Sequence, residues 1–220
     1  MGLTVITGAN RGIGLELVRQ LVARGREVVA VCRHNSPELE TLRVRVEPGY
    51  DLTDPAAASR LAVALGQSPI DLLIQNAGML VPDSLGGMDA AAVRAQFELN
   101  ALAPLFLTRA LLPRMQAGGK IALISSRMGS IGDNASGGHY GYRMSKAALN
   151  AAGVSLAKDL APHRIAVAIL HPGAVRTSMT AGTGTLEVDE SVRGLLARID
   201  ELTLETSGRF THQNGEELPW

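Results

Sequence analysis

The stretch Leu3-Thr4-Val5-Ile6-Thr7-Gly8-Ala9-Asn10-Arg11-Gly12-Ile13-Gly14, near the start of the chain, decides the fold. Its first part, Leu3–Thr7, is a short and largely apolar run, as expected for a strand buried on both faces. The glycine-rich part leads into Ile13–Arg24, which has the apolar spacing of a helix and ends at Gly25. In an open α/β sheet such a turn binds a dinucleotide pyrophosphate, because the helix N-terminus offers free N–H groups. Three glycines can also form a plain turn, but their place at the start of the sheet favours a nucleotide site.

Strand-like runs alternate with helical patterns along the rest of the chain. Further strands are predicted at Val28–Cys32, Leu42–Tyr50, Asp71–Gln75, Lys120–Ile124, Ile165–Leu170 and Gly208–His212. Helices are expected from Asp54-Pro55 onward, in two segments of Asp89–Met115 divided near Asn100, over Tyr140–Leu160 and over Val192–Ile199. The alternation predicts an α/β fold with a doubly wound parallel sheet of about seven strands. No repeat or linker divides the chain, so we expect residues 1–220 to form a single domain, with Thr180–Glu190 as a loop.

Composition excludes several classes of partner. Lys+Arg and Asp+Glu both number 21, and no basic stripe points to nucleic acid or acidic lipid. The N-terminus has no basic region of a signal peptide, and no run approaches the roughly 18 apolar residues of a membrane helix. The lone cysteine, Cys32, is expected to be a small buried hydrophobe, and the five histidines lack metal-ligand spacing, so we expect no metal. We therefore expect a cytoplasmic protein, and its zero net charge is compatible with a homodimer or homotetramer.

The residue after the second predicted strand indicates which dinucleotide binds. An NAD site usually has an acidic residue there to accept hydrogen bonds from the ribose 2′-hydroxyl. Here Arg33 follows Cys32, and Arg11 lies inside the glycine turn. A guanidinium binds a 2′-phosphate through a charge-assisted pair, whereas a carboxylate would repel it. Either arginine alone is equally compatible with an ordinary surface residue, but together they favour NADP(H).

A phenol and an ammonium are spaced four residues apart in Tyr142-Arg143-Met144-Ser145-Lys146, so they share one face of a helix. A nearby positive charge favours the phenolate and lowers the pKa of a tyrosine, which general acid–base catalysis requires. An exposed helix pair is the simpler interpretation of this spacing alone. Tyr140 is a weaker candidate, because Met144 takes the place of a lysine four residues on.

Taken together, these motifs resemble the short-chain dehydrogenase/reductase family over nearly the whole chain. The matching positions are the turn from Thr7 through Gly12 to Gly14, Asp51, Asn76-Ala77-Gly78, Asn100, Ser125-Ser126, Tyr142 with Lys146, Pro172-Gly173 and Thr177. The stretch Ser125–Gly132, the Tyr142–Lys146 segment and the ending Leu218-Pro219-Trp220 are similar to the branch of C-factor-like and sniffer-like carbonyl reductases. The resemblance implies a Rossmann-like fold and an NADP(H)-dependent oxidoreductase.

The resemblance also implies the role of each catalytic residue. Tyr142 would protonate the carbonyl oxygen as hydride arrives, and Lys146 would lower its pKa and hold the nicotinamide ribose. Ser126 would hydrogen-bond the substrate carbonyl, and Asn100 would support a water chain that resupplies the proton through Lys146. The implied cofactor-binding residues are Gly8, Asn10, Arg11, Gly12, Ile13, Gly14, Arg33, Asp51, Leu52, Asn76, Ala77, Gly78, Tyr142, Lys146, Pro172, Gly173, Val175 and Thr177.

Two departures from the family pattern leave alternatives open. Gln75 stands where the family often has an asparagine before Asn76, at a strand end that is mainly structural. Ser126 also lies 16 positions before Tyr142, a few more than usual, so Ser125 and Ser130 remain rival candidates for the serine.

Several side chains near these motifs have two interpretations. His139 is expected to be an exposed residue at a helix start, although it could touch substrate. Met128, Met144 and Met179 could form an adaptable substrate wall or could simply fill space in the core or rim.

The leading prediction for function is reduction of ketones or aldehydes with NADPH, in a reversible alcohol–carbonyl reaction. A non-catalytic NADP(H)-binding sensor or signalling protein is the alternative, although such relatives usually lack the tyrosine or the lysine. A purely structural subunit is disfavoured by the full catalytic set. The segment Thr177–Glu190, which follows the Pro-Gly turn, is short and lacks aromatic residues, and this predicts an open site with loose specificity.

Overall fold

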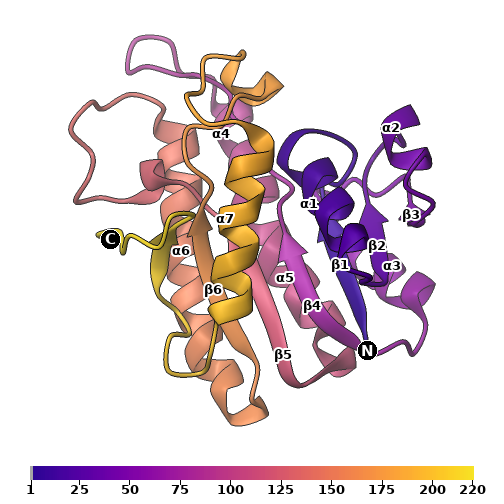
Figure 1. Ribbon diagram of the computed structural model, residues 1–220. Helices are drawn as coiled ribbons and strands as arrows, with labels where there is room; N and C mark the ends of the chain where they lie inside the picture. Colours follow the sequence, from indigo (N-terminus) through magenta and orange to yellow (C-terminus); the bar gives the residue numbers. More distant parts are fainter. Residues whose placement is uncertain (1) are drawn as a thin grey trace.

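The structure, a computed structural model, describes residues 2–220 and contains one parallel sheet (Figure 1). The seven strands lie in the order β3-β2-β1-β4-β5-β6-β7, and every neighbouring pair is parallel. Their bounds are β1 Leu3–Thr7, β2 Val28–Val31, β3 Arg45–Glu47, β4 Ile70–Gln75, β5 Met115–Ile124, β6 Ala166–His171 and β7 Phe210–His212. The predicted doubly wound α/β fold is therefore confirmed.

Helices cover both faces of this sheet. One face packs against α1, α2 and α7, and the other face packs against α3, α5 and α6. The helices are α1 Gly12–Ala23, α2 Pro37–Glu40, α3 Ala57–Leu65, α4 Ala90–Phe97, α5 Ala103–Leu111, α6 Tyr140–Leu160 and α7 Val188–Glu201. Short 3-10 turns follow at Leu112–Arg114, Arg127–Gly129, Ala161–His163 and Ser178–Thr180, and a π-helical turn spans Glu98–Leu102.

Alternation along the strands divides the core into two layers. In β1, Val5 belongs to the layer beneath α3, α5 and α6, whereas Ile6 belongs to the layer beneath α1 and α7. The same division separates Leu73 from Ile74 in β4. All four side chains are fully buried, because a central parallel strand has a helical layer on each face. This explains why the strands have no polar face in the sequence.

The order of the strands locates the functional end of the sheet. The chain winds outward from β1 to β3 and then crosses back to β4, so the winding reverses between β1 and β4. Ligands of open α/β sheets bind at the carboxyl ends of the strands beside such a reversal. The glycine turn Gly8–Gly14 follows β1 at this place.

Some element bounds differ from the sequence-based expectation. Only Arg45–Glu47 of the predicted run Leu42–Tyr50 pairs with a neighbour, because β3 is a short edge strand. The third helix begins at Ala57, and the Asp54 carboxylate instead caps the turn before it by accepting from the Ala56 amide at 2.9 Å. The last helix begins at Val188, inside the segment expected to be a loop.

The expected division of the helical region near Asn100 takes another form. Helix α4 runs through the π-helical turn Glu98–Leu102 directly into α5, so the chain does not leave the helix there. A π-turn inserts an extra residue and changes the direction of the side chains that follow. Asn100 lies within this turn and is fully buried.

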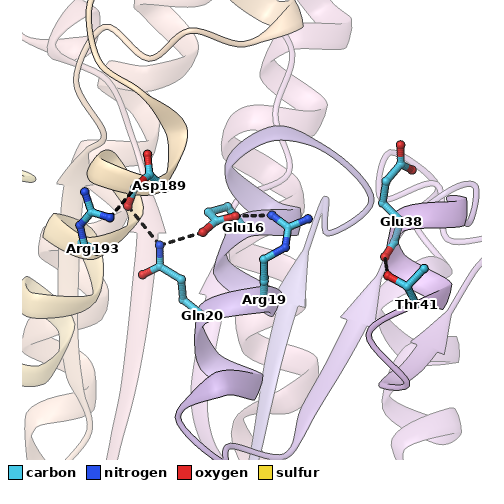
Figure 2. A network of polar contacts seen from close by, with 7 residues as sticks. All are labelled: Glu16, Arg19, Gln20, Glu38, Thr41, Asp189 and Arg193. Carbon is cyan, nitrogen blue, oxygen red and sulfur yellow. Dashed lines mark hydrogen bonds and ion pairs between the residues drawn. The ribbon is translucent and has the colours of Figure 1, made fainter.

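Polar side chains join α1 to α7 on the outer surface (Figure 2). The Gln20 amide donates to Glu16 at 2.9 Å within α1 and to the backbone carbonyl of Asp189 at 3.1 Å in α7. Asp189 also pairs with Arg193 at 2.6 Å, one turn further along α7. The helix that follows the glycine turn is thereby fixed beside the last helix. None of the helices within residues 2–220 combines the length and the apolar character needed to cross a membrane.

Candidate active site

The glycine turn packs too tightly for side chains at two of its three glycines. A Cβ atom on Gly14 would lie 2.1 Å from the Gly8 carbonyl oxygen, and one on Gly8 would lie 2.8 Å from the Ala77 Cα. Gly8 also has a φ of 65° and Gly12 a φ of 51°, the left-handed region that favours glycine. Glycine at these positions therefore lets the turn pack directly against itself and against Ala77 after β4.

A cleft of about 520 Å³ opens at this turn. It lies where the carboxyl ends of β1, β2 and β4 meet, next to the segment Thr177–Met179. Twelve of the predicted cofactor residues line it: Gly8, Asn10, Arg11, Gly12, Ile13, Arg33, Asp51, Leu52, Asn76, Ala77, Gly78 and Thr177. The lining of the cleft does not include Gly14, which is buried, or the predicted residues Pro172, Gly173, Val175, Tyr142 and Lys146. The cleft has the size and shape of a nucleotide site.

Two arginines with exposed side chains line the cleft. Arg11 precedes α1 and Arg33 follows β2, and both side chains are exposed. Across residues 2–220, neither arginine makes an ion pair with an acidic side chain. The Asp51 carboxylate accepts from the Thr53 hydroxyl at 2.7 Å, and this bond lowers the pKa of Asp51 more than the nearby charge of Arg33 does. The lining of the cleft therefore includes two positive charges that an anion could meet.

Asn76 stabilises the join between β1 and β4. Its side-chain amide donates to the carbonyls of Thr7 and Gly8 at 3.1 Å each, and its backbone N–H donates to the Thr7 hydroxyl at 3.0 Å. The Asn76 side-chain nitrogen is thus committed to the backbone of the glycine turn. Asn76 shapes the cleft by fixing that turn.

Tyr142 and Lys146 lie near the start of α6, and both side chains are buried. The Lys146 Nζ lies 5.8 Å from the centre of the Tyr142 ring and donates to the Ile124 carbonyl at 2.8 Å. Burial raises the pKa of Tyr142 to about 12, and burial lowers the pKa of Lys146 to about 8. The shift of Tyr142 is opposite to the one predicted from the charge of Lys146, because loss of hydration opposes the phenolate.

The three candidate serines have different partners. The Ser126 side chain lies close enough to the Tyr142 hydroxyl to lower the pKa of Tyr142 against the larger effect of burial, and its oxygen accepts from the Met128 amide at 3.2 Å. The Ser125 hydroxyl donates to Asn150 at 2.6 Å, and the Ser130 hydroxyl accepts from the Asp133 amide at 3.0 Å. The structure thus brings Ser126, rather than either rival, to the phenol of Tyr142.

Asn100 connects the segment after β4 to α6. Its side-chain oxygen accepts from the Met79 amide at 2.8 Å, and its side-chain nitrogen donates to the Met79 carbonyl at 2.9 Å. The same nitrogen donates to the Ser145 hydroxyl at 3.0 Å, one residue before Lys146. A Cβ on Gly78 would lie 3.2 Å from the Asn100 oxygen and 3.7 Å from the Lys146 Nζ, so these three residues converge.

The segment after Pro172-Gly173 is short and bonded to itself. Val175 forms a bridge with Leu186, and the Thr180 hydroxyl donates to the Val175 carbonyl at 2.8 Å. Gly173 has a φ of 89°, and a Cβ there would lie 3.0 Å from Leu186. Thr177 starts the turn Ser178–Thr180 and lies beside Gly12, where a Cβ would be 3.6 Å from the Thr177 methyl group, and both residues line the cleft.

Three residues that line the cleft belong to no recognisable motif and were not predicted: His34, Tyr50 and Thr53. In the sequence, only their position next to Arg33 or Asp51 could have indicated that they belong to the site. Met179 lines the cleft, whereas no contact places Met128 or Met144 there. His171 packs edge-on to His212 at 5.1 Å, and burial lowers its pKa to about 3. No local signal indicates that pairing, because β6 and β7 are distant in sequence.

Cys32 and His139 are the remaining candidates. Cys32 is a buried free thiol whose pKa is raised by burial, as expected for a buried hydrophobe. His139 begins α6 as expected, with a φ of 50°, but it is half-buried rather than exposed, because its amide donates to the Asp83 carbonyl at 3.0 Å and this holds it against the segment after β4.

Comparison with known proteins agrees with these features. A model of the short chain dehydrogenase family matches residues 3–187. Over 226 residues, the chain is 38% identical to 1-hydroxy-2-glutathionyl-2-methyl-3-butene dehydrogenase of Rhodococcus sp. (strain AD45), with all of both chains covered. Over 155 residues, it is 46% identical to the C-signal protein of Myxococcus xanthus, covering 69% of this chain and 93% of that protein.

Solved structures give the same result. The NADPH-bound carbonyl reductase from chicken fatty liver matches with a TM-score of 0.89 and 33% identity, covering 100% of this chain and 98% of that one. The carbonyl reductase Sniffer of D. melanogaster matches with a TM-score of 0.92 and 30% identity, covering 100% of both. The resemblance to the C-factor-like and sniffer-like branch is confirmed, and the chain belongs to the short-chain dehydrogenase family.

Proposed function

We propose that this protein is an NADP(H)-dependent oxidoreductase that interconverts ketones or aldehydes with alcohols, using Tyr142 as the proton donor. The observation that carries the proposal is that the phenol of Tyr142 and the ammonium of Lys146 are buried together, with the Lys146 Nζ 5.8 Å from the centre of the Tyr142 ring. The effect of Ser126 on the pKa of Tyr142 supports its place beside the phenol. Similarity to carbonyl reductases and to a dehydrogenase supports this reaction class.

The residues of the cleft fit NADP(H). Gly8 and Gly14 leave no room for a Cβ, as a backbone cradle for the pyrophosphate requires. Arg11 and Arg33 supply the positive charge that a 2′-phosphate needs, and Val31 is followed by no acidic residue that would repel it. Related structures are described as NADPH-bound or NADP-bound, which supports the same choice here.

Bound NADPH would supply the hydride, and the chain's own residues manage the proton. With a pKa near 12, Tyr142 is a neutral phenol at neutral pH and is ready to donate its proton to a carbonyl oxygen. Lys146, with a pKa near 8, is mostly protonated at neutral pH and stabilises the phenolate that this donation leaves. Ser126 would donate a hydrogen bond to the carbonyl oxygen and fix its direction.

Asn100 and the segment after β6 hold this arrangement. Asn100 fixes Met79 and Ser145, so it sets the distance between the cofactor cleft and α6. We propose that it also supports the water chain that returns a proton to Lys146. Pro172, Gly173, Val175 and Thr177 would hold the nicotinamide end of the cofactor.

The wider proposals concern specificity, assembly and location. The segment Thr177–Glu190 is short and lacks aromatic residues, which supports an open substrate site with loose specificity. We further propose that residues 1–220 act as a single domain in the cytoplasm and assemble as a homodimer or homotetramer.

Measuring oxidation of NADPH against a panel of quinones, aldehydes and diketones tests the proposal. We expect turnover by the wild type and loss of nearly all turnover in Tyr142→Phe, with NADPH binding retained. Tyr140→Phe is the matched control, because that tyrosine lies one half-turn away on the same helix. Full turnover by Tyr142→Phe would reject the assignment of Tyr142.

A signalling role without catalysis is the second candidate, and the similarity to the C-signal protein favours it. The presence of both Tyr142 and Lys146, buried and close together, argues for a working enzyme. Binding of NADPH without turnover on the whole panel would favour the signalling role.

A further inference from the structure

The helix that carries Tyr142 has no capping side chain of its own. Helix α6 begins at Tyr140, and the amide groups of its first turn have no acceptor within the helix. The side chain of His139, at the capping position, makes no cap hydrogen bond. Gly137, Gly138 and His139 have φ angles of 63°, 64° and 50°, so three left-handed residues precede the helix. The start of α6 therefore depends on an acceptor from elsewhere in the chain.

Asp83, 57 positions before Tyr140, supplies that acceptor. One carboxylate oxygen accepts from the Tyr140 amide at 2.5 Å, and the other accepts from the Gly141 amide at 2.8 Å. The Asp83 backbone carbonyl also accepts from the His139 amide at 3.0 Å. A carboxylate at a helix N-terminus is further stabilised by the helix dipole. Three consecutive amides that lead into Tyr142 are thus held by a single residue.

The segment that carries Asp83 is itself fixed. Asn100 binds both backbone groups of Met79, and the buried Gln96 accepts from the Val81 amide at 3.0 Å. A Cβ on Gly141 would lie 2.5 Å from the Gln96 side-chain nitrogen and 3.1 Å from Asp83. The α4 helix, the segment after β4 and the start of α6 therefore form a close-packed unit with Asp83 at its centre.

We propose that Asp83 is a positioning residue, which holds the start of α6 and thereby sets where Tyr142 and Lys146 lie against the end of β5. Both residues lie on α6, and Lys146 donates to the Ile124 carbonyl at the end of β5 at 2.8 Å, so their placement depends on where the helix begins. Within residues 2–220, the Asp83 carboxylate hydrogen-bonds backbone amides of α6 and not the side chains of Tyr142 or Lys146. The inference rests on the proposed function, because it assigns a role in the same reaction.

Asp83→Ala and Asp83→Asn test the proposal in the full-length protein, with Asp89→Ala as the matched control. Asp89 also caps a helix, since its carboxylate accepts from the Ala91 amide at 2.9 Å at the start of α4. We expect Asp83→Ala to lower kcat by about 10- to 100-fold at saturating NADPH, because small misplacements of reacting groups have effects of that size. The Kd for NADPH, measured by fluorescence, should stay within about twofold, because Asp83 does not line the cleft.

The conservative variant and the pH profile separate positioning from a general loss of stability. Asp83→Asn keeps one acceptor oxygen and should give an intermediate kcat, whereas Asp89→Ala should keep the wild-type kcat. A displaced α6 weakens the effect by which Ser126 lowers the pKa of Tyr142. When kcat for alcohol oxidation is plotted against pH, the rise that depends on formation of the Tyr142 phenolate should therefore occur at higher pH in Asp83→Ala than in the wild type.

The outcomes distinguish this inference from the proposed function. A kcat in Asp83→Ala equal to that in Asp89→Ala, a rise of kcat at the wild-type pH or a matching loss of NADPH affinity would each overturn the role of Asp83. If Asp83→Ala does not fold, Asp83→Asn decides by the same three measurements. Wild-type turnover in Tyr142→Phe would reject the proposed function together with this inference, whereas an inactive Tyr142→Phe beside a fully active Asp83→Ala rejects this inference alone.

Discussion

The Lys146 ammonium donates a hydrogen bond to the Ile124 backbone carbonyl at 2.8 Å, which ties α6 to the last residue of β5. Ser126 comes two residues after Ile124, so the same strand end carries the serine that lowers the pKa of Tyr142. Within residues 2–220 the Lys146 ammonium donates to this one carbonyl, and burial lowers its pKa to about 8. Lys146 is therefore both a link between two elements and a group poised to titrate near neutral pH.

The titration of Lys146 predicts a pH dependence of folding. The pKa of Lys146 is about 8 in the folded protein, whereas an ordinary lysine, as in the unfolded chain, has a pKa of 10.5. Between these two pH values the unfolded chain therefore binds more protons than the folded protein. Stability attributable to Lys146 should consequently rise with pH through this window, by roughly 2–3 kcal/mol. Urea unfolding of wild type and Lys146→Met at pH values of about 8 and 10 measures the difference, which Lys146→Met should lack.

Lys158→Met, at the exposed end of α6, is the control for this experiment and should follow the wild-type pH dependence. The same pH dependence in wild type and Lys146→Met would contradict the assignment.

The choice among the serines predicts three different phenotypes. Ser126→Ala should lower kcat by about 100-fold or more, because it removes a hydrogen bond aimed at the reacting oxygen. Ser125→Ala should instead lower the free energy of unfolding, because Asn150 loses its buried partner. Ser130→Ala should leave kcat near the wild-type value, because its hydroxyl only accepts from the Asp133 amide. Steady-state kinetics and urea unfolding of the three variants check this, and a catalytic defect confined to Ser130→Ala would reassign the serine.

The exposed guanidinium of Arg33 predicts cofactor preference. Arg33→Ala should weaken kcat/KM for NADPH by about 10- to 100-fold, the range expected for losing a charge-assisted pair, and should affect NADH little. The control is Arg24→Ala, since that exposed arginine pairs with Asp200 and does not line the cleft. Comparable kcat/KM for NADH and NADPH in the wild type would contradict the predicted preference.

The packing of the glycine turn predicts the effect of adding one methyl group. Gly14→Ala should lower the free energy of unfolding by about 1–3 kcal/mol, because the new Cβ would lie 2.1 Å from the Gly8 carbonyl oxygen. It should also weaken NADPH binding, since the turn must shift. Gly86→Ala, where no atom lies within 4 Å of the new Cβ, should change neither quantity. Wild-type stability and affinity in Gly14→Ala would show that the turn tolerates the shift.

Much of the fold could be predicted from local sequence. Buried parallel strands have no polar face, so Leu3–Thr7 was evident as a strand, and Tyr140–Leu160 matches α6 at both ends. The edge strand was overestimated, because Leu42–Tyr50 has a strand-like composition while only Arg45–Glu47 finds a partner. The sequence predicts a break in the helix near Asn100, where the structure has a π-turn. Both an extra residue within a helix and the end of a helix disturb the apolar periodicity, so the sequence pattern does not distinguish them.

The sequence by itself determined the positions of the glycine turn, the two arginines and the Tyr142–Lys146 pair, because each depends on spacing within one element. The tertiary structure alone decided which serine meets Tyr142 and which residue caps α6, because Ser126 and Asp83 reach that helix from distant segments. It also reversed the expected direction of the Tyr142 pKa. Spacing reveals a neighbouring charge, but the loss of hydration that opposes the phenolate arises only when the sheet and its helices close around the side chain.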